Sequence, residues 1–281
     1  MTGEMQIETK GLTVAYASDA QNKVVNDVSL SVRAGETLGI VGTTGSGKST
    51  IALSLLRLLP PGARLSGRIL VNGTDITDLP ISRLREIRGK TIGYIFQDSL
   101  ASLNPVMTVR TQVAETLRRH DRSLSHRDAR RAAEVALDEL GIPSKFFRSH
   151  PHEFSGGMRQ RAMIAIALAP RPSFLIADES TSELDAPTQR RVLDLLADIQ
   201  RTRGLGLMVI SHDLAVINHV CERVAVLSHG DLVEYGETRD VLGSPTAPET
   251  RDLIRMSAKA MTSSGRLYTV KHDRAASAPA A

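Results

Sequence analysis

Apolar residues along this chain change their spacing several times, and each change marks a predicted element. Alternating or short continuous apolar runs bounded by turn residues predict strands at 6–16, 24–32, 37–41, 67–72, 91–96, 174–177 and 207–210. Apolar residues at helical spacing predict helices at 51–59, 126–140, 158–169 and 188–201. The third of these four helices is preceded by a Ser-Gly-Gly turn, and the second begins after Ser125 and stops at Gly141, as capping preferences require.

The order of these elements predicts an α/β fold. Strands that alternate with helices favour a mainly parallel sheet, and the strands at the start of the chain favour an antiparallel β subdomain. The middle of the chain, at about 98–170, looks like an inserted α-helical lobe. We expect one domain at 1–245 and a C-terminal extension at 246–281, where the pattern weakens and 275–281 form a frayed tail.

Composition narrows the classes of protein that this chain could be. No stretch free of Asp, Glu, Lys and Arg exceeds eleven residues, whereas a spanning helix needs roughly 20 apolar residues. Residues 1–6 lack the pattern of a secretory signal, so we expect a cytoplasmic protein. The single cysteine, Cys221, excludes an internal disulfide, and a net charge of +4 with 3% aromatic residues argues against nucleic-acid binding.

The strongest chemical signal is a glycine-rich turn between the strand at 37–41 and the following helix. It matches the phosphate-binding pattern G-x-x-x-x-G-K-[ST] at Gly42, Thr43, Thr44, Gly45, Ser46, Gly47, Lys48 and Ser49, with Thr50 next in the helix. Glycines let backbone N–H groups turn toward phosphates, Lys48 supplies a positive charge and Ser49 can hold Mg²⁺. The positive end of the helix dipole favours the same anion. The turn therefore predicts a nucleoside triphosphate site.

A second signal is the pair Asp178-Glu179, which ends the apolar strand at 174–177. We expect the strand to deliver Asp178 to the Mg²⁺, through a water molecule, and Glu179 to orient and polarise an attacking water. A polar pair that merely ends a strand in solvent is the alternative. The phosphate loop favours the catalytic interpretation, because phosphoryl transfer needs positioning and charge neutralisation more than covalent chemistry.

Between these motifs lies a short turn, Ser155-Gly156-Gly157, that opens a helix. With this turn the chain resembles the ATP-binding cassette family, whose further motifs recur in order at Gln97, 178–179, 182–185 and His212. The resemblance extends over residues 6–245. It implies an ATPase with ATP and Mg²⁺ as cofactors.

The resemblance also implies roles for single residues. Glu179, His212 and Gln97 are the expected catalytic residues, with His212 contacting the γ-phosphate and Gln97 also sensing Mg²⁺. Asp185 is expected among the nucleotide-binding residues. Tyr16 stands where the family places an aromatic residue that stacks on adenine, although an ordinary tyrosine at a strand end is an equal alternative.

A head-to-tail dimer is the arrangement that the resemblance implies. ATP would lie between the Lys48 loop of one subunit and Ser155, Gly156 and Gly157 of the other, because one chain cannot place two distant anion sites on one phosphate. Binding would close the dimer and hydrolysis would release it. The second ATPase subunit is expected to be a different cassette, with a homodimer as the alternative.

Two segments, 97–109 and 150–161, resemble the importer branch for dipeptides, oligopeptides, nickel chelates and opines. This branch implies two transmembrane permease subunits, a substrate-binding protein outside the membrane and a peripheral place on the cytoplasmic face of the plasma membrane. The alternative is a soluble ATPase of a non-transport complex, such as phosphonate-cleaving machinery. Ser180 and Glu183 depart from the family pattern, where a proline and a small residue are usual.

Overall fold

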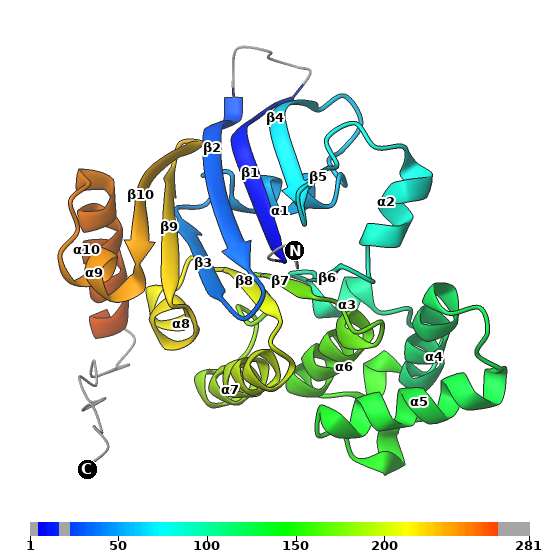
Figure 1. Ribbon diagram of the computed structural model, residues 1–281. Helices are drawn as coiled ribbons and strands as arrows, with labels where there is room; N and C mark the ends of the chain where they lie inside the picture. Colours follow the sequence, from blue (N-terminus) through cyan, green and yellow to red (C-terminus); the bar gives the residue numbers. More distant parts are fainter. Residues whose placement is uncertain (1–4, 17–22, 264–281) are drawn as a thin grey trace, which may run out of the picture.

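The computed structural model describes residues 5–16 and 23–263, which form two sheets and a set of helices (Figure 1). The first sheet has the strand order β2-β1-β4-β5 and is antiparallel throughout. Its strands are β1 (Gln6–Ala15), β2 (Lys23–Arg33), β4 (Arg64–Val71) and β5 (Thr74–Asp75). The turn between β4 and β5 holds Asn72 and Gly73 with positive φ, the conformation that a tight hairpin needs.

The second sheet has the strand order β10-β9-β3-β8-β7-β6. All neighbours are parallel except β9 and β10, which form an antiparallel pair at one edge. The strands are β3 (Thr37–Gly42), β6 (Ile92–Ile95), β7 (Phe174–Asp178), β8 (Gly206–Ile210), β9 (Arg223–Ser228) and β10 (Asp231–Glu237). The expected α/β fold with a mainly parallel sheet and an N-terminal antiparallel subdomain is therefore confirmed.

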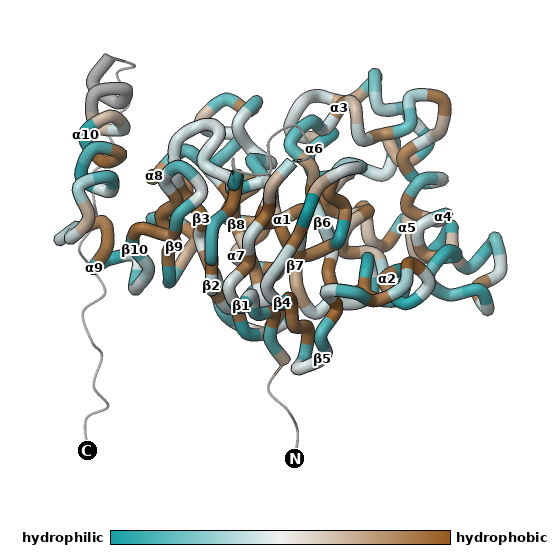
Figure 2. The backbone as a smooth tube through the Cα atoms, turned by 90° about the horizontal axis from the view of Figure 1, so that it is seen from above, coloured by the Kyte–Doolittle hydropathy of each residue, from teal (hydrophilic) through white to brown (hydrophobic). Residues whose placement is uncertain are grey.

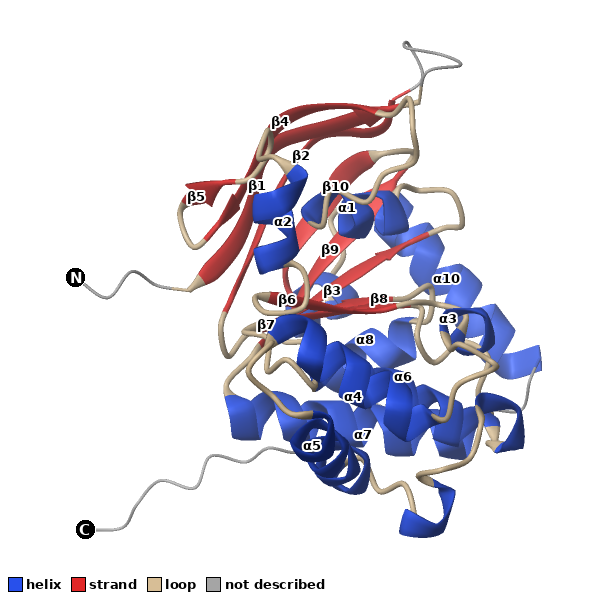
Figure 3. Ribbon diagram, turned by 90° about the vertical axis from the view of Figure 1, so that its right-hand side faces the viewer, coloured by secondary structure: helices blue, strands red, loops and turns tan. Residues whose placement is uncertain are grey.

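Helices lie on both faces of the second sheet (Figure 3). They are α1 (Lys48–Leu55), α2 (Ile81–Ile87), α3 (Ser99–Ser102), α4 (Val109–His120), α5 (His126–Glu139), α6 (Gly156–Leu168), α7 (Ala186–Arg203), α8 (Leu214–Val220), α9 (Thr238–Gly243) and α10 (Pro248–Ser263). Two short 3₁₀ helices lie at Ser144–Phe146 and Pro151–Glu153. Between β6 and β7 the chain contains only helices and loops, as the inserted lobe requires.

Alternation along the buried strands divides the interior into two cores. On β3 and β8, Ile40, Met208 and Ile210 pack toward α1 and the antiparallel sheet. Their neighbours Val41 and Val209 point to the other face and pack with the lobe, α7 and α8. Because both faces are covered, these strands are apolar almost throughout, and the hydrophobic centre of the molecule runs along them (Figure 2).

Local sequence explains where several helices begin and end. Ser125 accepts a hydrogen bond from the Asp128 N–H at the start of α5, and Gly141 follows that helix with a φ of 67°. The prediction that the helix after the phosphate loop reaches residue 59 was wrong, because α1 ends at Leu55. The Arg88 side chain donates to the carbonyls of Leu56 and Arg57, at 2.8 and 2.7 Å, and so caps that end.

Some elements were not predicted. The apolar pattern weakened beyond about residue 243, yet α10 extends from Pro248 to Ser263 beside β10 and α9 (Figure 1). The Glu234 carboxylate on β10 accepts hydrogen bonds from the N–H groups of Thr246 and Ala247 and so anchors the segment that leads into α10. The expected frayed tail at 275–281 lies outside the described residues.

Candidate active site

The carboxyl ends of the parallel strands meet at one edge of the second sheet, and most of the predicted site residues gather there. Ala177 pairs with Ile95 on one side and Val209 on the other, and Ile40 pairs with Ile210. This register aligns the ends of β3, β6, β7 and β8. In open α/β sheets, ligands bind outside this edge.

The phosphate loop follows β3, and two of its glycines have no substitute. A Cβ atom on Gly42, at φ 156°, would lie 2.2 Å from the Leu227 carbonyl oxygen. A Cβ atom on Gly47, at φ 100°, would lie 2.5 Å from the Val24 carbonyl oxygen. Both contacts are with backbone carbonyl oxygens, which could move aside only if the strands that carry them were distorted. The loop therefore keeps its shape only with glycine at these positions.

Lys48 lies inside the loop that precedes it. Its Nζ donates hydrogen bonds to the carbonyl oxygens of Gly42, at 3.0 Å, and Thr43, at 2.9 Å. Burial lowers the pKa of Lys48, while the charges of Glu179 and Asp178 oppose that shift. An ammonium group held at a glycine-rich loop is suited to neutralising a phosphate.

Asp178 ends β7 and lies buried, with an exposed fraction of 5%. Its Oδ1 accepts a hydrogen bond from Ser49 Oγ at 3.0 Å, and its Oδ2 accepts one from the Tyr94 hydroxyl at 2.8 Å. Burial raises the pKa of Asp178, and these two hydrogen bonds oppose the rise because they favour the charged form. The carboxylate is thus oriented toward the first turn of α1.

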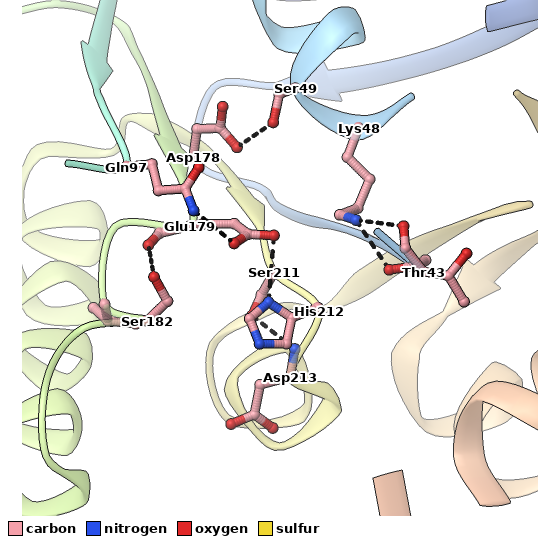
Figure 4. Close-up of polar contacts among 12 residues, drawn as sticks. Thr43, Lys48, Ser49, Gln97, Asp178, Glu179, Ser182, Ser211, His212 and Asp213 are labelled. Carbon is pink, nitrogen blue, oxygen red and sulfur yellow. Dashed lines mark hydrogen bonds and ion pairs between the residues drawn. The ribbon is translucent and has the colours of Figure 1, made fainter. Parts of the chain in front are cut away.

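Glu179 forms the centre of a polar cluster (Figure 4). Its Oε2 accepts a hydrogen bond from Gln97 Nε2 at 3.2 Å, and its Oε1 lies 3.3 Å from His212 Nδ1. Gln97 follows β6, Glu179 follows β7 and His212 follows β8. A carboxylate held between an amide and an imidazole is suited to accept a proton from a water molecule.

The backbone at Glu179 is strained. Its φ is 44°, in the left-handed region, which costs a residue with a side chain about 1 to 2 kcal/mol. The Glu179 N–H donates to the Ile210 carbonyl at 2.9 Å, and Ser182 Oγ donates to the Glu179 carbonyl at 2.9 Å. These bonds hold the turn and aim the Glu179 side chain toward Gln97 and His212. Strain of this kind is common at functional sites.

The segment after Glu179 borders a cavity of about 160 Å³. Ser180, Leu184 and Val216 contribute to its lining. Asp185, at the end of this segment, caps α7, where its carboxylate accepts a hydrogen bond from the Thr188 N–H at 3.3 Å. Its contacts with Thr188 lower the pKa of Asp185. The structure thus gives Asp185 a clear role in starting α7.

Tyr16 lies at the end of β1, next to the helix of the phosphate loop. Its hydroxyl is 3.3 Å from Thr50 Oγ1 in the first turn of α1. This contact brings the aromatic ring to the neighbourhood of the loop and also ties β1 to α1. The geometry is compatible both with a nucleotide contact and with a structural tyrosine.

Ser155, Gly156 and Gly157 lie apart from this cluster. Ser155 caps α6, where its hydroxyl accepts a hydrogen bond from the Met158 N–H at 3.3 Å. Among the residues that the structure describes, no hydrogen bond or ion pair joins this turn to the phosphate loop. Helix α6 lies in the lobe, whereas α1 lies on the opposite face of the sheet (Figure 3). The structure does not bring the two predicted phosphate contacts of one chain together.

The edge of the sheet fits a magnesium nucleotide. Mg²⁺ in such sites keeps several waters and takes one or two protein oxygens together with phosphate oxygens. Asp178 and Ser49 offer a carboxylate and a hydroxyl that are already in contact. The Ser46 hydroxyl in the loop is buried and finds no hydrogen-bond partner among the described residues, so the loop carries an unused donor. The Ser46 hydroxyl suits a phosphate oxygen as its acceptor, and the oxygens of Ser49 and Asp178 suit the cation.

Tyr94 was missed as a site residue by sequence reasoning. It lies on β6, two residues before Phe96 and three before Gln97, and its hydroxyl contacts Asp178 directly. A tyrosine in an otherwise apolar strand next to a predicted site was the only available signal. Which strand neighbours β7, and on which face Tyr94 lies, became clear only from the sheet order.

Comparisons with known proteins agree with this geometry. The family model "ABC transporter" matches residues 25–182. The oligopeptide transport ATP-binding protein OppD of Salmonella typhimurium is 40% identical over 267 residues, which are 94% of this chain and 79% of that protein. OppD of Lactococcus lactis is 38% identical over 274 residues, 96% of this chain and 81% of that protein.

A solved structure has a similar fold. The dimeric ATP-binding cassette MJ0796, in a post-hydrolysis state with ADP and Pi bound, superimposes with a TM-score of 0.75 at 29% identity. The match covers 83% of this chain and 99% of that structure. Within residues 5–16 and 23–263, no helix is long and apolar enough to cross a membrane.

The family model, the relatives and the solved structure agree with one another. They show that the chain belongs to the ABC transporter family and is one of its ATP-binding and ATP-hydrolysing cassettes.

Proposed function

We propose that this chain is the ATPase subunit of a membrane importer for peptides or related small solutes, such as nickel chelates or opines. The observation that carries the proposal is the cluster of Gln97, Glu179 and His212 beside the phosphate loop and Asp178. The relatives named for oligopeptide transport support peptides as the cargo class. Neither carries a name that favours a soluble complex without transport.

ATP binding is assigned to the phosphate loop, residues 42–50, and to Tyr16. The N–H groups of the loop, the Lys48 ammonium and the start of α1 together provide positive potential for the phosphates. Ser49 and Gln97 would hold Mg²⁺, with Asp178 acting through a water molecule. When bound, this ion supplies neutralisation of charge on the phosphate oxygens. Tyr16 would stack on the adenine.

Hydrolysis is assigned to Glu179. Its carboxylate would polarise the attacking water and accept a proton from it as the water oxygen bonds to the γ-phosphorus, while the bond from that phosphorus to the β–γ bridging oxygen breaks and ADP leaves. His212 and Gln97 orient this carboxylate from two sides, at 3.3 and 3.2 Å. The backbone of Glu179 is held by hydrogen bonds at both its N–H and its carbonyl. The Cα of Glu179 therefore keeps one position relative to the site, which favours a constant orientation of the carboxylate.

A second cassette completes the site in this proposal. Ser155, Gly156 and Gly157 of one subunit, at the N-terminus of α6, would face the γ-phosphate held by the other subunit, with Asp185 near the contact. Their distance from the phosphate loop of their own chain and the dimeric state of a structural relative support this arrangement. ATP then joins the two subunits, and hydrolysis separates them. The two cassettes are proposed to be different chains.

The other proposed partners are two permease subunits in the membrane and, indirectly, a substrate-binding protein outside it. Exposed apolar side chains lie at Leu100 and Val106 in the lobe and at Phe96 just before it, with exposed fractions of 53, 79 and 46%. Such side chains suit a contact with a membrane subunit. We therefore place the chain at the cytoplasmic face of the plasma membrane, as a peripheral subunit.

The test is to isolate the tagged chain from gently solubilised membranes of its host and to identify its partners by mass spectrometry. Recovery of two multi-span permeases and a second cassette would support the importer. Recovery of soluble partners only, with intact ATPase activity, would contradict it and favour the non-transport alternative. An untagged host supplies the control for non-specific capture.

A further inference from the structure

Tyr94 contacts a carboxylate that the proposed function places at the magnesium nucleotide, although no role was assigned to this tyrosine. We propose that Tyr94 is a positioning residue that holds Asp178 in the orientation needed to support Mg²⁺. The inference rests on the proposed role of Asp178. It adds a residue within β6 to a proposed metal site whose other residues are Ser49 of α1, Asp178 of β7 and Gln97, which follows β6.

The two oxygens of Asp178 have different hydrogen-bond donors. Ser49 Oγ donates to Oδ1 and the Tyr94 hydroxyl donates to Oδ2, at 3.0 and 2.8 Å. With a donor on each side, rotation of the carboxylate about its last bond would break both hydrogen bonds. Hydrogen bonds to a charged acceptor are stronger than those between neutral groups. Tyr94 therefore helps to fix the plane of the carboxylate and the direction in which its oxygens point.

The position of the Tyr94 ring is itself well determined. Tyr94 pairs with Ile176 across the β6–β7 ladder, two residues before Asp178. Its ring packs on Phe96, with a centroid distance of 4.6 Å and an interplanar angle of 58°. Phe96 directly follows the strand, two residues after Tyr94, so the two rings lie close together at its end. The hydroxyl consequently reaches Asp178 from a rigid element rather than from a loop.

The chemistry of the hydroxyl suits the role of a permanent donor. A phenol hydroxyl has one proton to donate, and here the Tyr94 hydroxyl donates it to Asp178 Oδ2 at 2.8 Å. Only a protonated phenol can donate to the carboxylate. Tyr94 also contributes to the lining of a second cavity, of about 170 Å³, together with Thr116 and Ile166 of the lobe.

The experiment measures how much Mg²⁺ strengthens nucleotide binding. ATP affinity is measured by isothermal titration with Mg²⁺ and with EDTA, in a Glu179→Gln background that prevents turnover during the titration. In the parent we expect a higher ATP affinity with Mg²⁺ than with EDTA, and this difference is the gain from Mg²⁺. Tyr94→Phe keeps the ring and removes only the hydroxyl, and we expect the gain in ATP affinity from Mg²⁺ to be about 10-fold smaller, with the ATP affinity in EDTA unchanged.

Tyr235→Phe is the matched control. The Tyr235 hydroxyl also donates one hydrogen bond within the protein, to the Ser31 carbonyl at 3.1 Å, but it lies between β10 and β2. Its loss should change the stability of the fold without changing the gain from Mg²⁺. An unchanged gain in Tyr94→Phe would overturn the inference and leave the tyrosine a purely structural role.

Asp178→Asn separates this inference from the proposed function. If Tyr94 acts through Asp178, adding Tyr94→Phe to Asp178→Asn should reduce the gain no further. Independent, additive losses would contradict the inference. If Asp178→Asn itself keeps the full gain from Mg²⁺, the proposed metal site fails as well. If Asp178→Asn loses the gain and Tyr94→Phe keeps it, the metal site stands and only the role of Tyr94 is refuted.

Discussion

The edge of the parallel sheet and the Ser155-Gly156-Gly157 turn are both rich in groups that suit phosphate, but they are organised differently. At the sheet edge, aligned strands bring Lys48, Asp178 and Glu179 close together, so that the charges of both carboxylates act on the Lys48 ammonium. The turn instead begins a single helix of the lobe. One region is assembled within the chain, whereas the other is presented outward. The difference is what the proposed dimer requires, in which one chain would supply two unlike halves of a shared site.

The largest effect is expected from changing Glu179 at the sheet edge. Glu179→Gln keeps the shape and the contact with Gln97 but removes the group that accepts the proton, so turnover should fall about 100- to 10,000-fold. ATP affinity should stay close to that of the parent. Measurements of kcat and of nucleotide binding test both parts.

Glu86→Gln is the control for this change. Glu86 is an exposed glutamate of α2, where its side chain has an exposed fraction of 70%. Its replacement should leave kcat unchanged. Turnover near the parent value in Glu179→Gln would show that the catalytic assignment is wrong.

Lys48→Ala tests binding at the same edge. The ammonium is expected to contact phosphate, and a hydrogen bond to a charged group is worth roughly 1.5 to 3 kcal/mol. ATP affinity should therefore fall about 10- to 100-fold, measured by titration in EDTA so that Mg²⁺ does not contribute. Lys145→Ala, in a 3₁₀ helix of the lobe, is the control. Equal ATP affinities for Lys48→Ala and the parent would show that the loop is not the phosphate site.

Ser155→Ala tests the outward-facing turn. We expect ATP binding to the single chain to be unchanged, because Ser155 contacts no part of its own phosphate loop, while turnover of the dimer falls about 10-fold. Loss of the N-cap also costs about 1 kcal/mol of helix stability. The measurement is ATPase activity as a function of protein concentration.

Ser125→Ala provides the matched control, since Ser125 caps α5 through the same hydrogen bond to a backbone N–H. It should cost similar stability and leave turnover intact. If Ser155→Ala and Ser125→Ala have the same activity, the turn is only a helix cap. The proposed sharing of the site between two subunits would then lose its main support.

The smallest effect is expected at Tyr16. Stacking on adenine is worth about 0.5 to 1.5 kcal/mol, so Tyr16→Ala should weaken ATP binding roughly 2- to 12-fold without lowering kcat. Tyr16→Phe keeps the ring and loses only the contact with Thr50. It should bind ATP as the parent does. A lower melting temperature in both variants with unchanged ATP affinity would instead identify an ordinary strand-end tyrosine.

Much of the site was predictable because its chemistry is local in the sequence. The phosphate loop is eight consecutive residues, and its two critical glycines are required by the backbone of Leu227 and Val24. Asp178 and Glu179 are adjacent and end an apolar strand. The positions of seven strands were also predictable, because alternating and continuous apolar runs depend only on which faces are buried, whereas β5, β9 and β10 were not predicted.

Other features could not be predicted because they depend on contacts between distant segments. The contact of Tyr94 with Asp178 depends on β6 lying next to β7, and the end of α1 depends on Arg88 reaching Leu56 and Arg57. Helix α10 was missed because its position is set by Glu234 on another element as well as by its own pattern. No local spacing encodes such pairings.

The sequence by itself determined which groups are present and in which elements they lie. Local backbone preferences and the burial of apolar faces act over a few residues, so motifs and strands can be identified from the order of amino acids. Only the tertiary structure decided which groups meet, because strand order and register bring segments such as Gln97, Glu179 and His212 together across more than 80 positions. It also decided that the turn at Ser155 lies apart from the phosphate loop, since α6, which this turn opens, and α1 pack on opposite faces of one sheet (Figure 3).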